Sequence, residues 1–552
     1  MLATIHSATL SGIDSMAVDV QAFFGKGLPE FDIVGLGDTA VRESRVRVKS
    51  ALESSGLTLP SRHVVLNLAP ADVKKSGSAL DLAIALALLC AGGVVNNTRI
   101  DQLLVLGELT LSGELRPIRG VLSHLRLARQ RGLTRAIVPS GNAHEAALIA
   151  GFDTRVAGCL RDAVQYLDGE LELRRALPGD PVASERSLLD LDDVRGQQAA
   201  KRALEIAAAG GHNLLMLGPP GTGKTMLAQR LGSIMPPPTE SEALEIATIA
   251  SAVGASTPAT LASVQRPFRA PHHSASHAAL VGGGTPIRPG EVTLAHRGVL
   301  FLDELPEFAR STLESLRPTM ESGLAMVVRA HQRIVWPAAP LVVAAMNPCP
   351  CGYADDPTRV CSCTSDRIER YRTRISGPLL DRFDLHIALR PVDARALREG
   401  ARGESSAEVG KRVQAARSRA LLRAKQHANA PSASRAGSID DLAEHSDPAA
   451  LALLDRAVDA LGLSVRAYVK VLRVARTIAD LEAEPSVSVA HMAEAVQYRL
   501  LDRKPESTRA QPRSRSPASS TRDEQNSKPS LAARASEPPA DLISHQPQET
   551  QV

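Results

Sequence analysis

The stretch Gly-Pro-Pro-Gly-Thr-Gly-Lys-Thr at positions 218–225 constrains the fold of this chain more than any other. It matches the G-x-x-x-x-G-K-T pattern in full, follows an apolar run at 214–217 and leads into a helical pattern at 226–231. In such a strand–loop–helix unit, backbone N–H groups and the helix N-terminus form a cradle for phosphate. The sequence therefore predicts a site for ATP, or a close relative, in an α/β fold. The predicted phosphate loop comprises Gly218, Pro219, Pro220, Gly221, Thr222, Gly223, Lys224 and Thr225.

Two side chains of this loop have specific expected roles. Lys224 is expected to reach the β- and γ-phosphates, and Thr225 is expected to ligate Mg²⁺. The alternative interpretation is a surface turn rich in glycine and proline. It is disfavoured because a buried strand is predicted directly before the loop.

A second run is predicted to complete the ATP site. Four apolar residues at 299–302 precede Asp303 and Glu304, as in a buried strand that ends in carboxylates. Asp303 is expected to bind the Mg²⁺ shell, and Glu304 is expected to polarise the attacking water. A core strand that leads into a helix would explain this run alone. The full phosphate loop upstream favours the nucleotide site.

Length and composition bound the remaining possibilities. A chain of 552 residues should form several domains. With 64 Lys and Arg against 60 Asp and Glu, the net charge of +4 gives no global argument for nucleic-acid binding, so any basic surface must be local. Residues 1–13 lack a signal-peptide pattern, and the longest apolar run, 82–95, is too short to span a bilayer. The expectation is a cytoplasmic protein with no membrane partner.

Four of the six cysteines cluster in one polar loop as two C-x-C pairs. Four thiolates can close a tetrahedral Zn²⁺ site, although C-x-C is tighter than the usual C-x₂-C spacing. A redox pair is the main alternative, and a disulfide framework is not expected in so long a chain. The candidate Zn²⁺ ligands are Cys349, Cys351, Cys361 and Cys363.

The region before the phosphate loop alternates strand and helix patterns, which indicates an α/β or α+β unit. Strands are predicted at 32–37, 63–68 and 103–108, and helices at 41–55 and 79–90.

Two stretches of this region resemble the peptidase domain of Lon, which has a ribosomal-S5-domain-2-like α+β fold. Residues 75–81 correspond to the nucleophile turn of that family, and residues 111–122 correspond to the segment with its partner lysine. Ala79 and Leu122 occupy the serine and lysine positions, and neither can act as nucleophile or base. The resemblance therefore implies a Lon-like domain without the Ser–Lys dyad.

Between the predicted ATP-site strands, residues 324–336 form two apolar runs around a polar tip, which predicts a β-hairpin. Arg329, His331 and Arg333 at the tip could follow a phosphate backbone, and a solvated hairpin end is the alternative. His272 and His273 could be ligands, catalysts or parts of an insert loop.

The C-terminal part is predicted to be helical, with apolar periodicity at 449–461, 464–481 and 489–501. The last segment is rich in Ser, Pro and Gln and is predicted to be disordered. The predicted organisation is a Lon-like domain at 1–175, a linker at 176–190, an ATPase core at 191–400, a helical lid at 401–503 and a tail at 504–552.

The order of these parts resembles the YifB/ComM family of magnesium-chelatase-like AAA+ ATPases. The resemblance rests also on Gly-Leu-Gly-Asp-Thr-Ala-Val-Arg-Glu-Ser at 35–44, Met-Asn-Pro-Cys-Pro-Cys-Gly at 346–352 and Ser-Gly-Pro-Leu-Leu-Asp-Arg at 376–382. It implies a parallel sheet between helices with a helix-2 insert and a helical lid. It also implies a hexameric ring that drives DNA branch migration during natural transformation, as a helicase. The alternatives are a magnesium-chelatase-like motor subunit and a protein-remodelling ATPase.

The resemblance also assigns roles to individual residues. Asn347 would help orient the attacking water, and Val194 and Gln197 would lie against the adenine. Arg382 would enter the ATP site of a neighbouring subunit, and Arg466 would sense nucleotide from the first turn of a lid helix. A surface salt bridge and an exposed helix-start arginine are the respective alternatives for the last two.

Overall fold

The protein is described here by a computed structural model. The described residues are 2–35, 37, 39–71, 75, 77–96, 98–177, 189–256, 264–285, 287–329, 332–354, 356, 359–392, 398, 402–428 and 439–499. Most of the predicted linker at 176–190 and all of the predicted tail at 504–552 lie outside them. None of the described helices is long and apolar enough to cross a membrane.

A parallel sheet forms the centre of the described residues after 189. Its strands follow the order β12-β15-β18-β11-β19, and every adjacent pair is parallel. This confirms the predicted α/β core with a parallel sheet. The strands are β11 (Leu214–Leu217), β12 (Phe268–Arg269), β15 (Val299–Leu302), β18 (Leu341–Met346) and β19 (Leu385–Ala388).

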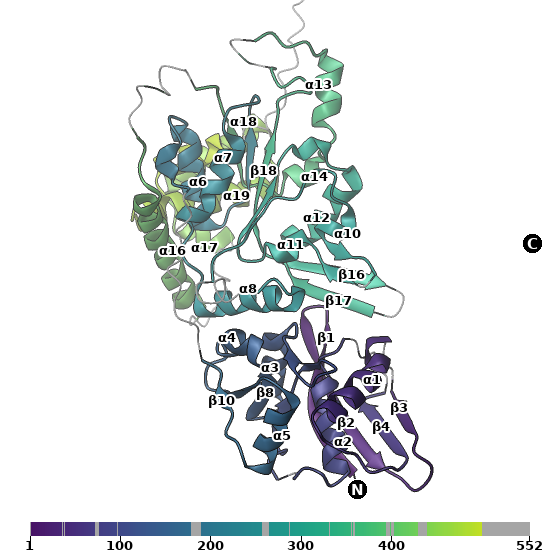
Figure 1. Cartoon of the computed structure of the whole chain (residues 1–552). Coiled ribbons are helices and arrows are strands. Elements are labelled where there is room, and N and C mark those ends of the chain that lie inside the picture. Colours follow the sequence, from purple (N-terminus) through teal and green to yellow (C-terminus); the bar gives the residue numbers. More distant parts are fainter. Residues whose placement is uncertain are drawn as a thin grey trace, which may run out of the picture. The chain divides into compact units, whose positions relative to one another are not determined.

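Helices cover both faces of this sheet, because alternate residues of a strand point to opposite sides. Leu214 and Met216 pack toward α6 (Gln198–Gly210) and α7 (Lys224–Ile234), whereas Leu215 packs on the other side. The other side is covered by α8 (Glu240–Val253), α12 (Arg310–Ser322) and α14 (Gly377–Leu380). In Figure 1, α6 and α7 lie across β18 from α12 and α14.

The C-terminal helices pack on the α6–α7 side in one hydrophobic core. The predicted helices at 449–461 and 464–481 are present with nearly the predicted ends, whereas the last ends at Gln497 instead of 501. The helices of this part are α16 (Ser406–Ala428), α17 (Ile439–Glu444), α18 (Pro448–Leu461), α19 (Val465–Leu481) and α20 (Val489–Gln497).

The N-terminal region contains a mixed sheet with the order β10-β9-β8-β5-β1-β2-β4-β3. Its two longest strands, β1 (Leu2–Ser11) and β2 (Asp14–Phe24), form an antiparallel pair that the sequence analysis missed. Ser7 and Thr9 are buried in β1, and these polar side chains obscure the apolar alternation of the strand. The remaining strands are β3 (Phe31–Val34), β4 (Val64–Ala69), β5 (Leu103–Val105), β8 (Arg135–Pro139), β9 (Asp153–Ala157) and β10 (Arg174–Arg175).

The helices that pack beside this sheet include α1 (Thr39–Ser54), α2 (Asp81–Ala91), α3 (Val121–Gln130) and α5 (Leu160–Asp168). The predicted helices at 41–55 and 79–90 are therefore present. The predicted strand at 103–108 is wrong in extent, since β5 ends at Val105 and a separate two-residue strand begins at Glu108.

The predicted hairpin at 324–336 is present as β16 (Leu324–Arg329) and β17 (Gln332–Pro337), paired antiparallel. Arg333 is exposed, whereas His331 and the side chain of Arg329 lie outside the part of the chain that the structure describes.

The base of this hairpin contacts the N-terminal region through the only tryptophan of the chain, Trp336. Its side chain is fully buried, in one hydrophobic cluster with Ile13. Gly12, in the turn between β1 and β2, has a φ of +70°, and a Cβ at this position would lie 2.5 Å from Trp336 Nε1. Glycine therefore allows the turn to approach the indole ring closely.

We predict that Gly12→Ala changes the Trp336 fluorescence spectrum and destabilises this contact. The matched control is Gly132→Ala, because Gly132 has a φ of +78° but open space around its missing Cβ. Both variants carry backbone strain, but only the first overpacks, so its free energy of unfolding should fall by about 1–3 kcal/mol more. Equal stabilities and unchanged emission in both variants would contradict the contact.

Candidate active site

The predicted ATP-site residues meet at one edge of the parallel sheet. Lys224 follows β11 through the phosphate loop, Asp303 follows β15 directly, and Asn347 follows β18 directly. The carboxyl ends of parallel strands share an edge, where ligands bind in open α/β sheets. Lys224 Nζ lies 3.0 Å from Asn347 Oδ1, and Thr225 Oγ1 lies 2.8 Å from Asp303 Oδ2. The structure therefore brings together side chains that are far apart in sequence.

The Lys224 ammonium is held over the phosphate loop. Its Nζ donates hydrogen bonds to the carbonyl oxygens of Gly218 at 2.7 Å and Pro219 at 2.9 Å. Burial lowers the pKa of Lys224, while the charges of Asp303 and Glu304 act in the opposite direction. A cation in this position can exchange its carbonyl partners for phosphate oxygens.

The loop itself has the backbone that its glycines allow. Gly221 and Gly223 have φ values of +79° and +87°, and a Cβ at either would meet nothing within 4 Å. Thr222 Oγ1 closes the turn with a 2.9 Å hydrogen bond to the Pro219 carbonyl. Pro220 lies at the outer side of the turn, against Gly352.

Thr225 and Asp303 fit the predicted Mg²⁺ role. Their hydroxyl and carboxylate oxygens point at each other, and oxygen atoms are the ligands that Mg²⁺ prefers. Asp303 Oδ1 also accepts a 2.9 Å hydrogen bond from the backbone N–H of Glu304, which orients the carboxylate.

Glu304 occupies an unusual backbone position, with a φ of +52° and a ψ of +46° where β15 turns into a short helix. A residue other than glycine in this region carries strain, which is often found at functional sites. The Glu304 carboxylate lies 3.1 Å from His273 Nδ1. His273 follows the edge strand β12, so the contact joins two neighbouring strands of the sheet. Sequence reasoning left His273 without a partner, and only tertiary structure supplies one.

The segment predicted to lie near adenine is attached to the phosphate loop. Val194 is buried in the core, and Gln197 has a φ of +55°. Gln197 Nε2 donates to the carbonyl of Thr222 at 3.3 Å and of Arg390 at 2.7 Å. Gln197 therefore lies beside the loop, Val194 belongs to the core that includes α6 and α7, and the contact of both residues with adenine stays a prediction.

Arg382 lies apart from this constellation. It forms an ion pair with Glu321 of α12, and not with its neighbours Asp381 or Asp384. Burial lowers the pKa of Arg382, and repulsion from Arg466 and Arg317 lowers it further. Within the described part of the chain, no hydrogen bond or ion pair joins Arg382 to Lys224, Asp303 or Glu304.

Arg466 is the second residue of α19, whose N-cap Ser464 accepts a hydrogen bond from the Ala467 N–H. Its side chain is exposed. The position of Arg466 in the first helical turn agrees with the prediction, and its nucleotide-sensing role stays a prediction.

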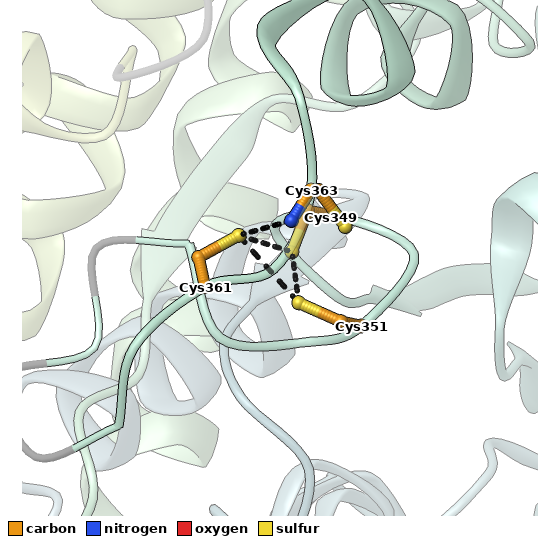
Figure 2. A group of neighbouring side chains, drawn as sticks. All are labelled: Cys349, Cys351, Cys361 and Cys363. Carbon is orange, nitrogen blue, oxygen red and sulfur yellow. Dashed lines mark hydrogen bonds between the residues drawn. The ribbon is translucent and has the colours of Figure 1, made fainter.

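The four clustered cysteines also converge. Figure 2 shows the sulfur atoms of Cys349, Cys351 and Cys361 facing one another, with Cys363 beside them. The four sulfur atoms all lie within 4.8 Å of one another, and none of these thiols is in a disulfide.

Comparison with known proteins gives the relationship of the whole chain. The family model "Magnesium chelatase, subunit ChlI" matches residues 190–397, "Subunit ChlI of Mg-chelatase" matches 20–142, and the "subunit ChlI C-terminal" model matches 403–499. Protein YifB of Salmonella typhimurium is 45% identical over 91% of this chain and 98% of its own length. Competence protein ComM of Haemophilus influenzae is 43% identical over the same shares. The chain belongs to the YifB/ComM family.

A shorter similarity accompanies this membership of the YifB/ComM family. DNA repair protein RadA of Haemophilus influenzae is 32% identical to this chain over 25% of the chain and 32% of its own length. The full-length relatives therefore identify the family, and the RadA similarity is confined to one part.

We predict that Lys224→Ala weakens binding of a fluorescent ATP analogue by about 10- to 100-fold, the effect of one or two hydrogen bonds to a charged group. Lys411→Ala is the matched control, because Lys411 is exposed on α16, outside this constellation. The measurement is a fluorescence titration with both variants and the parent protein. Equal affinities in all three proteins would remove Lys224 from the site.

Proposed function

We propose that this YifB/ComM protein is an ATP hydrolase that works as a ring-shaped DNA motor. The observation that carries the proposal is the meeting of Lys224, Thr225, Asp303 and Asn347 at one sheet edge. Phosphoryl transfer needs mainly positioning and charge stabilisation, and these are the side chains that supply both.

In the proposed reaction, Lys224 binds the β- and γ-phosphates, and Thr225 and Asp303 hold Mg²⁺, which neutralises phosphate charge when bound. Glu304 polarises the attacking water, and Asn347 orients it. The Glu304 carboxylate contacts His273 through Oε2, and an ionised carboxylate has a second oxygen that can accept a hydrogen bond from the attacking water.

The proposed assembly is a homo-hexamer in which Arg382 acts on the neighbouring ATP. Support comes from its separation from the phosphate loop of its own chain and from its position beside Arg466 and Arg317. In this assembly Arg382 would exchange its ion pair with Glu321 for the triphosphate bound by the neighbouring subunit. Arg466 is proposed to contact nucleotide from the start of α19.

DNA is the proposed cargo, with branch migration in natural transformation or recombination as the proposed activity. This choice is supported by the names of two relatives, competence protein ComM and DNA repair protein RadA. The exposed Arg333 near the tip of the β16–β17 hairpin supplies a positive charge for the DNA backbone.

A second candidate is the motor subunit of a magnesium chelatase, because the matching family models all describe parts of subunit ChlI. A third is a protein-remodelling ATPase. Turnover stimulated by DNA, by a porphyrin-binding partner or by unfolded polypeptide separates the three.

We also propose that the N-terminal region, residues 1–175, is a Lon-like domain without peptidase activity. Leu122, at the position expected for the base, is wholly buried in α3 and has no ionisable group. The ATPase core at 191–400 and the lid at 401–503 complete the proposed division.

We expect single-stranded or branched DNA to stimulate ATP hydrolysis severalfold. Glu304→Gln should retain ATP binding but lower turnover by about 10²- to 10⁴-fold, the usual contribution of general acid–base catalysis. Phosphate release and ATP binding are measured on the same preparations, with Glu307→Gln as the control because Glu307 pairs with Arg374 at the surface. Full turnover in Glu304→Gln would remove that residue from its role, and indifference to every DNA structure would reject the motor.

We predict that Lys224→Ala and Arg382→Ala, each inactive alone, restore activity when mixed. In a head-to-tail ring, each shared site needs Lys224 of one subunit and Arg382 of the next. In an equal mixture, a site is complete only where an Arg382→Ala subunit supplies the lysine and a Lys224→Ala subunit supplies the arginine, which is about one interface in four. The hydrolysis rate is measured against the mixing ratio, and sizing in the presence of ATP checks assembly. A mixture that assembles but stays inactive would place Arg382 in its own subunit's site.

A further inference from the structure

The four-cysteine loop between β18 and α13 (Ser365–Arg372) has the dimensions of a metal site. The sulfur–sulfur distances are 3.3 Å for Cys349–Cys351, 3.5 Å for Cys351–Cys361 and 3.7 Å for Cys349–Cys361. Tetrahedral Zn²⁺ with Zn–S bonds of 2.3 Å requires sulfur atoms about 3.8 Å apart. These three thiols thus stand close to the spacing that one zinc ion imposes, and the sulfur atom of Cys363 lies within 4.8 Å of each of them.

The surroundings of the sulfur atoms also suit thiolates. The backbone N–H of Ala354 donates to Cys349 Sγ at 3.3 Å, and the N–H of Cys363 donates to Cys361 Sγ at 3.4 Å. Such donors stabilise the negative charge of ligating sulfur and fix its orientation. A redox pair, the alternative interpretation, needs two thiols and leaves the convergence of the other two unexplained.

This loop is connected to the candidate ATP site on two sides. Asn347, which accepts the hydrogen bond from Lys224, stands two residues before Cys349. Gly352 has a φ of +89°, and a Cβ there would lie 2.6 Å from Pro220 Cδ, so the loop backs directly onto the phosphate loop. Arg372 Nε of α13 donates a 3.2 Å hydrogen bond to the Pro348 carbonyl, which ties the start of the loop to the helix that follows it.

We propose that Cys349, Cys351, Cys361 and Cys363 hold one Zn²⁺, and that this ion fixes the loop that positions Asn347 and supports Pro220. The metal site stands independently of the DNA motor. Its effect on nucleotide binding rests on the proposed ATP site. The same ion would hold both the first part of the loop, at Cys349 and Cys351, and the last part, at Cys361 and Cys363. Loss of the ion should therefore loosen the contact between this loop and the phosphate loop.

The first test measures metal content in the full-length, tag-free protein by mass spectrometry. We expect one zinc per chain in the parent and in Cys159→Ser, and none in the double variant Cys361→Ser/Cys363→Ser. Cys159 is the matched control because it is a free thiol at the N-cap of α5 (Leu160–Asp168), where serine is a preferred residue. Zinc-free parent protein, or zinc retained by the double variant, would overturn the site.

A second measurement does not depend on the folding of a variant. Parent protein produced in cobalt-supplemented medium should show the thiolate-to-cobalt charge-transfer absorption and the strong visible bands of tetrahedral Co²⁺. The Cys159→Ser control should show the same spectrum. Absence of thiolate–cobalt bands in the parent would overturn the assignment.

The coupling is tested on the double variant after circular dichroism shows that it is folded. Misplacement of supporting groups by about 1 Å can cost about 100-fold, so we expect ATP affinity or turnover to fall about 10- to 100-fold relative to Cys159→Ser. Parent-like affinity and turnover in a folded, zinc-free variant would overturn the coupling. Stoichiometric zinc without DNA stimulation would instead reject the motor and support the metal site.

Discussion

The relative register of β11, β15 and β18 is the constraint on which the proposed chemistry depends. Leu217 stands level with Met346, and Leu302 stands level with Ala344. Since Leu302 and Met346 face the α8–α12 side, the residues that follow them turn toward α7. A slip of one residue would send Asp303 or Asn347 to the opposite face, away from Thr225 and Lys224. The buried apolar residues of both faces therefore fix the polar site indirectly.

The features that the sequence predicted well are those set by local pattern. The phosphate loop, the strands that end at Asp303 and Asn347, and the hairpin at 324–336 each contain their own signal within a few residues. Features that depend on contacts between distant residues were missed. The contact between His273 and Glu304 joins neighbouring strands, and the partner of Arg382 is Glu321 of another helix and not an adjacent aspartate.

The N-terminal region shows a different limit of prediction. Burial of Ser7 is possible because its hydroxyl donates a 2.7 Å hydrogen bond to the Val105 carbonyl of the adjoining strand. That compensation is invisible until β1 and β5 are paired. In contrast, α2 is predictable from the sequence alone. All its residues are buried, so the helix is a continuous apolar run that can be recognised without knowledge of its partners.

The glycine turn against Trp336 has a mechanical consequence. The Trp336 ring packs directly against the backbone of Gly12, with no side chain between them. Because protein interiors are close-packed, a tilt of the β16–β17 hairpin would displace the β1–β2 turn as well. β1 and β2 are the longest strands of the N-terminal sheet, so a displacement of their turn would extend into the centre of that sheet. In the proposed DNA motor, a movement of the β16–β17 hairpin would therefore be transmitted through Trp336 to the N-terminal region.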